Sequence, residues 1–413
     1  MTKELNLAKE QAPKFSNPFR PGAGHMPPFL AGRKDEEAEF RRLLKQDVIL
    51  ENLVLTGLRG LGKTVLLETF KPIAISEGWL WAGTDLSESA SISEENLAIR
   101  ILTDLSVVTS SIILTGEQNS RYLGKAEKTT RQTTMNFKYL ANLYSETPGL
   151  ILDKLKAVLE TVWGYLKQLN RRGIIFAYDE AQNLADNAAR DQFPLSLLLD
   201  VFQSIQRKGV PFMLALTGLP TLFPKLVEAR TFSERMFRVV FLNPLDKEDT
   251  KAAILKPIDN AECPIAIAPE SVNTIWSITQ GYPYFIQYVC REVYDVWVQA
   301  TQDGKKEMPR VPVNELMRKL DTDFFSGRWA RATDRQRELL SVISQLENAD
   351  GEFTVQEIVE LSVQKLEKSF SASHVNQMLS SLSDAGLIYK NRHGKYSYAV
   401  PLMSGFIKRQ NVA

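Results

Sequence analysis

Residues 54–64 have the composition and spacing of a phosphate-binding loop, because they read VLTGLRGLGKT. An apolar run of strand length precedes the glycines, and an apolar run of helix length follows them. Glycine lets the backbone turn so that its N–H groups face a phosphate, and the amino-terminal end of a helix favours the same anion. The sequence therefore predicts a site for a nucleoside triphosphate, ATP, lined by Gly57, Leu58, Arg59, Gly60, Leu61, Gly62, Lys63, Thr64 and Val65.

Two side chains at the end of this loop are suited to direct contact with the ligand. Lys63 is expected to reach the β- and γ-phosphates, and the Thr64 hydroxyl is expected to bind Mg²⁺. The alternative interpretation is a glycine-rich turn that binds nothing. The strand before the loop and the helix after it favour the phosphate site.

A second candidate element is the apolar run 174–178, which ends in two acids. Asp179 is expected to hold Mg²⁺ through water, and Glu180 is expected to orient and polarise the attacking water. A strand followed by an acidic turn is the alternative. Because a phosphate-binding loop lies upstream, the pair is interpreted as the Walker B half of the same site, and the adjacent glutamate favours hydrolysis over binding alone.

Polar residues near other strand ends are further candidates. Thr217 closes the apolar run 214–216 and is predicted to contact the γ-phosphate or the water, although an ordinary strand end explains it nearly as well. Gln182 is a second candidate for the same contact, at the same level as Thr217.

An arginine just before a strand can stabilise charge on the γ-phosphate of a neighbouring subunit. Arg235 is the first choice for this role, with Arg230 and Arg238 as alternates. A surface arginine paired with Glu234 is the competing interpretation.

The elements that must position these residues follow an α/β pattern. Strands and helices alternate over residues 29–245, which predicts a P-loop NTPase core with a parallel sheet. Residues 113–136 are polar and are predicted to form a loop or a partly ordered segment. The other predicted parts are a proline-rich extended arm over 1–28, a helical lid over 246–325 and a winged helix-turn-helix over 331–413.

Composition excludes several classes of protein. The chain has 413 residues, a net charge of +1 and two cysteines, so it has no global basic field, disulfide framework or zinc spacing. Residues 1–14 lack the apolar core of a signal peptide, and no apolar run is long enough to span a bilayer. The expectation is a cytoplasmic protein with no membrane partner.

In this order and spacing, the motifs make the chain similar to AAA+ ATPases of the initiator-like, archaeal-ATPase and STAND-related branch. The similar segments are 28–33 with Glu36 and Glu37, 57–64, 179–182, 217–220, 233–235 before 242–245, and 281–283. The resemblance implies that Gly32 and Arg33 lie at the adenine, that Thr217 is sensor 1, and that Pro283 opens a nucleotide-sensing lid helix. It also implies a homo-oligomer in the ATP state.

Two departures from the family pattern indicate slow hydrolysis used as a switch. Residues 281–284 read GYPY and lack the sensor 2 arginine that many AAA+ proteins carry near this point. Thr217 stands where asparagine is common.

The C-terminal module leaves two functions open. Residues 371–398 contain the predicted third helix and the wing, and they are the candidate DNA contact. The polar residues expected to face outward are Ser373, His374, Asn376 and Gln377 on the helix, and Lys390, Arg392, His393 and Lys395 on the wing. Because residues 369–385 contain no Arg or Lys, a STAND-like signalling or scaffold ATPase with a protein partner is the alternative to a DNA-associated switch.

Overall fold

The computed structural model describes residues 16–122, 125–263, 265, 267–304, 310–392 and 394–410. The chain divides into two compact units. The sheet unit consists of Lys34–Leu58 and Lys63–Leu242, and the helical unit consists of Met1–Arg33, Arg59–Gly62 and Asn243–Ala413. Of the arm expected over 1–28, residues 1–15 lie outside the described residues.

The sheet unit is built on five parallel strands in the order β2-β5-β6-β1-β7. Their bounds are β1 (Asn52–Thr56), β2 (Trp79–Ala82), β5 (Gly173–Tyr178), β6 (Phe212–Gly218) and β7 (Phe237–Phe241). Every residue of β1, β5 and β6 is buried. Central strands of a parallel sheet are covered on both faces, which explains their apolar sequences. The predicted α/β fold is confirmed.

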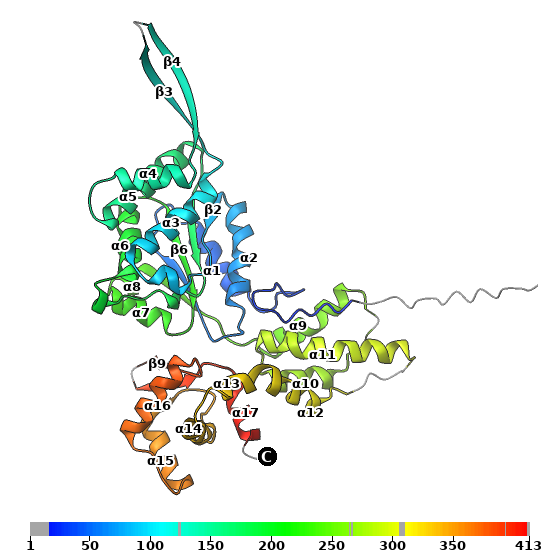
Figure 1. Ribbon diagram of the computed structural model, residues 1–413. Coiled ribbons are helices and arrows are strands. Elements are labelled where there is room, and N and C mark those ends of the chain that lie inside the picture. Colours follow the sequence, from blue (N-terminus) through cyan, green and yellow to red (C-terminus); the bar gives the residue numbers. More distant parts are fainter. Residues whose placement is uncertain are drawn as a thin grey trace, which may run out of the picture. The chain divides into compact units, whose positions relative to one another are not determined.

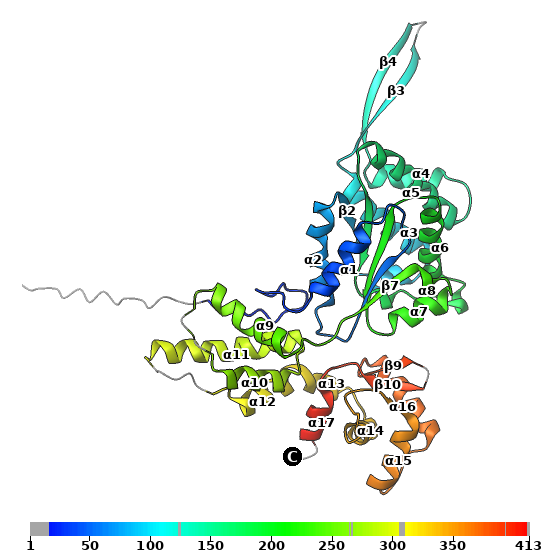
Figure 2. The ribbon, with the colours of Figure 1, turned by 180° about the vertical axis from the view of Figure 1, so that it is seen from behind.

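Helices cover both faces of this sheet. Figures 1 and 2 show α1 (Lys34–Leu44) and α2 (Lys63–Ser76) on one face, and α3 (Glu94–Thr109), α5 (Ile151–Gln168) and α6 (Pro194–Arg207) on the other. A large core joins the second group to the sheet, and Phe176 of β5 packs edge-on against Phe202 of α6. The remaining helices of this unit are η1 (Glu88–Ser91), α4 (Phe137–Glu146), η2 (Ala181–Asn183), η3 (Ala188–Arg190), α7 (Leu222–Ala229) and α8 (Ser233–Met236).

The expectation of a loop over 113–136 is wrong, because β3 (Ile113–Tyr122) and β4 (Lys125–Thr134) form an antiparallel hairpin. The hairpin extends away from the helices of the sheet unit (Figures 1 and 2). Polar residue types occupy both alternating sets of positions along the two strands. The period-two pattern that normally reveals a half-buried strand is therefore missing from the sequence.

From Asn243 onward, the helical unit consists of a group of helices followed by a small domain. The first group contains α9 (Lys247–Asn260), α10 (Pro269–Thr279), α11 (Pro283–Gln302) and α12 (Val313–Leu320), followed by the π-helical turn η4 (Asp321–Ser326) and α13 (Gly327–Trp329). The small domain contains α14 (Asp334–Ser344), α15 (Val355–Lys365), α16 (Ala372–Asp384) and α17 (Met403–Gln410).

A three-stranded antiparallel sheet makes this small domain winged-helix-like. Its strand order is β8-β10-β9, with β8 (Phe353–Thr354), β9 (Ile388–Arg392) and β10 (Lys395–Tyr398). Thr354 forms a capping box at the start of α15, and Ser371 caps α16. Among the described residues, no helix combines the length and apolar character that crossing a bilayer requires.

Candidate functional site

The order of the strands brings the predicted site residues to one edge of the sheet. Strand β6 lies between β1, which the phosphate-binding loop follows, and β5, which Asp179 follows. Thr217 is the second-last residue of β6. Because all three strands are parallel, their carboxyl ends lie at the same edge, where open α/β sheets bind ligands.

The phosphate-binding loop has the backbone that its glycines predict. Gly60 and Gly62 adopt φ values of 83° and 86°, a region that other residues seldom occupy. Lys63 opens α2, and its buried Nζ donates to the carbonyl oxygens of Gly57 (2.9 Å) and Leu58 (3.0 Å). The amine is thus held against its own loop, and phosphate oxygens would be stronger acceptors than these neutral carbonyls.

Asp179 is the point at which the separate motifs meet. This residue is only 5% exposed. The Thr64 hydroxyl donates to Oδ2, the Thr217 hydroxyl donates to Oδ1, and the Glu180 N–H donates to Oδ1 at 2.8 Å. Three donors satisfy a buried carboxylate that would otherwise be costly to remove from water.

The oxygen atoms of this group fit the predicted Mg²⁺ ion. Mg²⁺ takes oxygen ligands, usually from one or two protein groups with water and phosphate completing the set. The Thr64 hydroxyl and the Asp179 carboxylate are such ligands and are already within hydrogen-bonding contact of each other.

Glu180 has an unusual backbone conformation. Its φ of 51° and ψ of 35° lie in the left-handed region, which costs a non-glycine residue about 1 kcal/mol or more. Strain of this kind concentrates at functional sites. The Glu180 side chain is exposed, and its Oε2 accepts a hydrogen bond from Nε2 of Gln182.

Comparisons with known proteins agree with this architecture. The Walker-type ATPase PABY2304 of Pyrococcus abyssi superposes with a TM-score of 0.55 and 15% identity, covering 92% of this chain and 96% of that chain. The ADP form of the ORC2 protein of Aeropyrum pernix also gives a TM-score of 0.55, with 14% identity over 95% of this chain and 98% of that one. A family described as a domain of unknown function, DUF8462, matches residues 322–407. No curated protein gave a sequence match.

The chain has the AAA+ P-loop ATPase fold. At 14–15% identity the likeness concerns architecture. It includes the parallel sheet of the AAA+ core, the helices that follow it and the small C-terminal antiparallel sheet.

Arg33, which the AAA+ resemblance places at the adenine, is bound to backbone carbonyls in the helical unit. It is 6% exposed, and its Nη2 donates to the oxygens of Leu61 and Asn243, both at 3.0 Å. Gly32 has a φ of 61°, and a Cβ at this position would come within 2.5 Å of Asp249 Oδ2. Arg33 therefore ties residue 61 of the phosphate-binding loop to the segment that enters α9.

The start of α11 contacts the same loop within the helical unit. Pro283 is the first residue of α11, and the N–H of Tyr284 donates to Gly60 O at 3.1 Å. Gly281 has a φ of 74°, and a Cβ there would lie 2.1 Å from Leu245 O, so this approach to α11 requires glycine.

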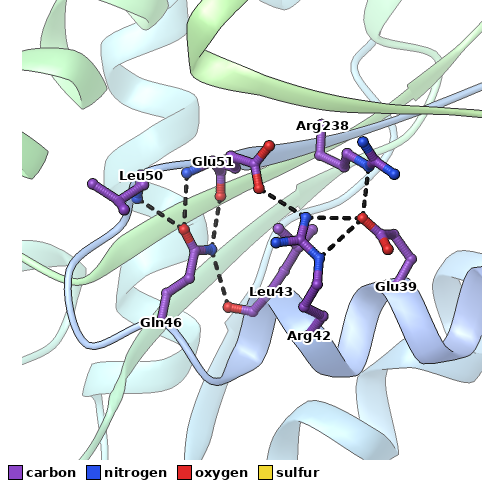
Figure 3. A network of polar contacts seen from close by, with 7 residues as sticks. All are labelled: Glu39, Arg42, Leu43, Gln46, Leu50, Glu51 and Arg238. Carbon is purple, nitrogen blue, oxygen red and sulfur yellow. Dashed lines mark hydrogen bonds and ion pairs between the residues drawn. The ribbon is translucent and has the colours of Figure 1, made fainter.

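The three arginines proposed as a finger differ in their partners. Arg230 forms a bidentate ion pair with Asp200, through Nε at 2.8 Å and Nη2 at 2.7 Å. Arg238 forms an ion pair with Glu39 at 2.6 Å in the network of Figure 3. Arg42 in the first place, and then Arg238, hold the pKa of Glu39 below its usual value. Arg235 is exposed and makes no ion pair with any other residue in the described ranges.

The winged-helix-like domain exposes the residues predicted on its third helix. Ser373, His374, Asn376 and Gln377 are all exposed on α16, whereas Val375 and Met378 are buried. The Arg335 guanidinium of α14 lies 4.0 Å from the ring of Phe370, just before α16. Two acids from other elements lie beside the wing: Asn391 of β9 donates to Glu352, and Lys395 helps to lower the pKa of Glu357 of α15, after the larger effect of the Thr354 hydroxyl. His393 and the Arg392 side chain lie outside the described residues.

Sequence reasoning could not find two of the contacts described above, one in the sheet unit and one in the winged-helix-like domain. Gln182, predicted to contact the γ-phosphate or the water, joins Glu180 to the N–H of Leu219. Arg335 of α14, which also pairs with Glu338, lies over the Phe370 ring just before α16. Each contact joins residues that belong to different elements, and no local pattern marks it.

Replacing Arg33 with methionine should destabilise the helical unit. The change leaves the carbonyls of Leu61 and Asn243 without their donor, at a cost of about 1–3 kcal/mol. Urea unfolding followed by tryptophan fluorescence measures the loss. Arg20→Met is the matched control, because Arg20 is exposed. Equal midpoints for the two variants would contradict the structural role given to Arg33.

Proposed function

We propose that this chain is a cytoplasmic switch that binds ATP with Mg²⁺ and hydrolyses it slowly to ADP and phosphate. The observation that carries the proposal is the hydrogen-bonded group of Thr64, Asp179 and Thr217 next to Glu180. It combines oxygen ligands suited to Mg²⁺ with a second carboxylate suited to water. The similarity of the fold to a Walker-type ATPase, and to a protein described in an ADP form, supports the choice of nucleotide.

The proposed roles follow from the groups present. The Lys63 amine leaves the carbonyls of Gly57 and Leu58 and neutralises charge on the β- and γ-phosphates. Glu180 accepts a proton from water as the water oxygen attacks the γ-phosphorus and the bond to the β,γ-bridging oxygen breaks. Bound Mg²⁺, held by Thr64 and Asp179, would supply further neutralisation of the phosphate charge.

The bonding of Thr217 supports slow hydrolysis. Its hydroxyl donates to Asp179, so this donor is already engaged and is not free to stabilise charge on the phosphate. In addition, residues 281–284 provide no arginine that could do so. Slow hydrolysis prolongs the ATP-bound state, as a switch requires.

Two variants test the nucleotide site. Lys63→Ala should weaken ATP binding by about 100-fold, because bonds from a charged donor contribute about 3 kcal/mol. Glu180→Gln should bind ATP normally and hydrolyse it at least about 100-fold more slowly, as expected for loss of a general base. Fluorescent-nucleotide titration and phosphate release measure the two effects. Lys71→Ala, an exposed lysine on the same helix, is the control. Wild-type hydrolysis by Glu180→Gln would remove Glu180 from its role.

We further propose that ATP assembles several copies of the chain and that Arg235 completes the site of a neighbour. The supporting observation is that Arg230 and Arg238 are already paired, whereas Arg235 is exposed and has no ion-pair partner among the residues described. An arginine at a phosphoryl-transfer site accelerates hydrolysis by about 1,000-fold or more.

Arg235→Ala should bind ATP and lose about 1,000-fold in hydrolysis. Mixing it with Glu180→Gln should restore activity, because the intact site of one subunit would receive Arg235 from the other. Phosphate release from the mixture, with light scattering in an ATP analogue, measures both properties. Arg238→Ala is the matched control. Failure of the mixture to recover activity, or full activity of Arg235→Ala alone, would contradict a role in trans.

For the target of the switch we propose DNA, contacted by residues 371–398. The exposed polar face of α16 supports this choice. A STAND-like switch with a protein partner is the second candidate, favoured by Glu352 and Glu357 beside the wing cations.

A gel shift with a 30-base-pair duplex and an ATP analogue separates the two targets. Binding should weaken steeply between low and physiological salt, because phosphate contacts release counterions. The double change Asn376→Ala with Gln377→Ala should lower affinity by about tenfold or more, at about 1 kcal/mol for each contact. Gln356→Ala, on an exposed position of α15, is the control. Absence of salt-sensitive binding would contradict the DNA target and favour the protein partner.

A further inference from the structure

Gln182 occupies the turn η2, two residues after Glu180, and uses both ends of its amide. Its Nε2 donates to Glu180 Oε2, and its Oε1 accepts from the N–H of Leu219 at 3.1 Å. Leu219 follows the end of β6, 37 residues further along the chain. One half-buried side chain thus connects the acid after β5 to the segment after β6.

The position of Gln182 is fixed from two further directions. Lys225 of α7 donates from Nζ to the Gln182 carbonyl oxygen at 2.7 Å, and burial lowers the pKa of this amine. Gly218 packs so closely that a Cβ there would lie 2.6 Å from Gln182 Oε1. The amide therefore has little freedom to rotate away from Glu180.

The end of β6 holds both acids of the site by different means. Thr217 donates its hydroxyl to Asp179, and Leu219, two residues later, reaches Glu180 through Gln182. Without this link, Glu180 would be an exposed side chain on a strained backbone, free to sample several rotamers. With Oε2 occupied by Gln182, Oε1 makes no hydrogen bond to any other residue in the described part of the chain.

We propose that Gln182 is a positioning residue for ATP hydrolysis, which holds the Glu180 carboxylate with Oε1 available to the attacking water. This inference rests on the proposed function, in which Glu180 accepts the proton of that water. It differs from a direct contact between Gln182 and the γ-phosphate, because Gln182 acts through Glu180. Fixing a catalytic group within a fraction of an ångström changes rates by up to about 100-fold.

Glutamine suits this position because its amide is both a donor and an acceptor. Gln182→Glu keeps an oxygen for the Leu219 N–H but removes the donor to Glu180 and places a second negative charge beside it. Gln182→Leu removes both bonds while keeping a similar size. The pair of variants therefore separates the link to Glu180 from the link to Leu219.

Single-turnover hydrolysis and ATP titration should be measured for the wild type, both Gln182 variants, Glu180→Gln and the double variants. We expect both Gln182 variants to lower the rate of hydrolysis about 10- to 100-fold, with ATP affinity and melting temperature unchanged. In the Glu180→Gln background, the Gln182 changes should have no further effect, because the group they position is already lost. Asn183→Ala is the matched control, since it removes a 3.0 Å bond to Leu86 O from the same turn and should hydrolyse as the wild type does.

The outcomes distinguish a failure of the positioning role of Gln182 from a failure of the proposed ATP hydrolysis. Normal hydrolysis by Gln182→Glu and Gln182→Leu, while Glu180→Gln is impaired, would overturn the positioning role alone. An equal loss in the wild-type and Glu180→Gln backgrounds, or a matching loss of ATP affinity, would also overturn it, because Gln182 would then act independently of Glu180. A wild type that does not hydrolyse ATP would overturn both.

Discussion

The site depends on the need of one buried carboxylate, that of Asp179, for hydrogen-bond donors. A carboxylate this far from water must be satisfied, and its donors come from three places in the chain: Thr64 after the phosphate-binding loop, Thr217 on β6 and the backbone of Glu180. These bonds fix the spacing between the start of α2 and the two strand ends. They also fix the backbone of Glu180, which is strained and needs such support.

The central sheet makes this convergence possible. Strands β1, β5 and β6 are neighbours, buried along their whole length, so their carboxyl ends cannot shift relative to one another without disturbing the core. The polar site therefore stands on a rigid apolar base. Above this base, Lys63 is held by hydrogen bonds to loop carbonyls and Glu180 by a hydrogen bond from Gln182.

Sequence patterns predicted the parts of the molecule whose physical causes are local. The apolar runs that became β1, β5 and β6 and the glycines of the loop report on neighbouring residues in the chain. The hairpin β3–β4 was missed because its polar composition hides strand alternation. The bonds of Arg33 and Gln182 were missed because each joins residues brought together only by the fold.

The hairpin β3–β4 has a consequence for how the sequence of this protein can evolve. Strands β3 and β4 pair only with each other among the described strands, and Leu114 at the base packs against the core of the sheet unit. A strand of ten residues spans about 34 Å, so most of the ribbon lies beyond the elements that stabilise the fold. Because segments outside the packed elements tolerate insertions and deletions, the length of this ribbon can change without altering the register of the five-stranded sheet.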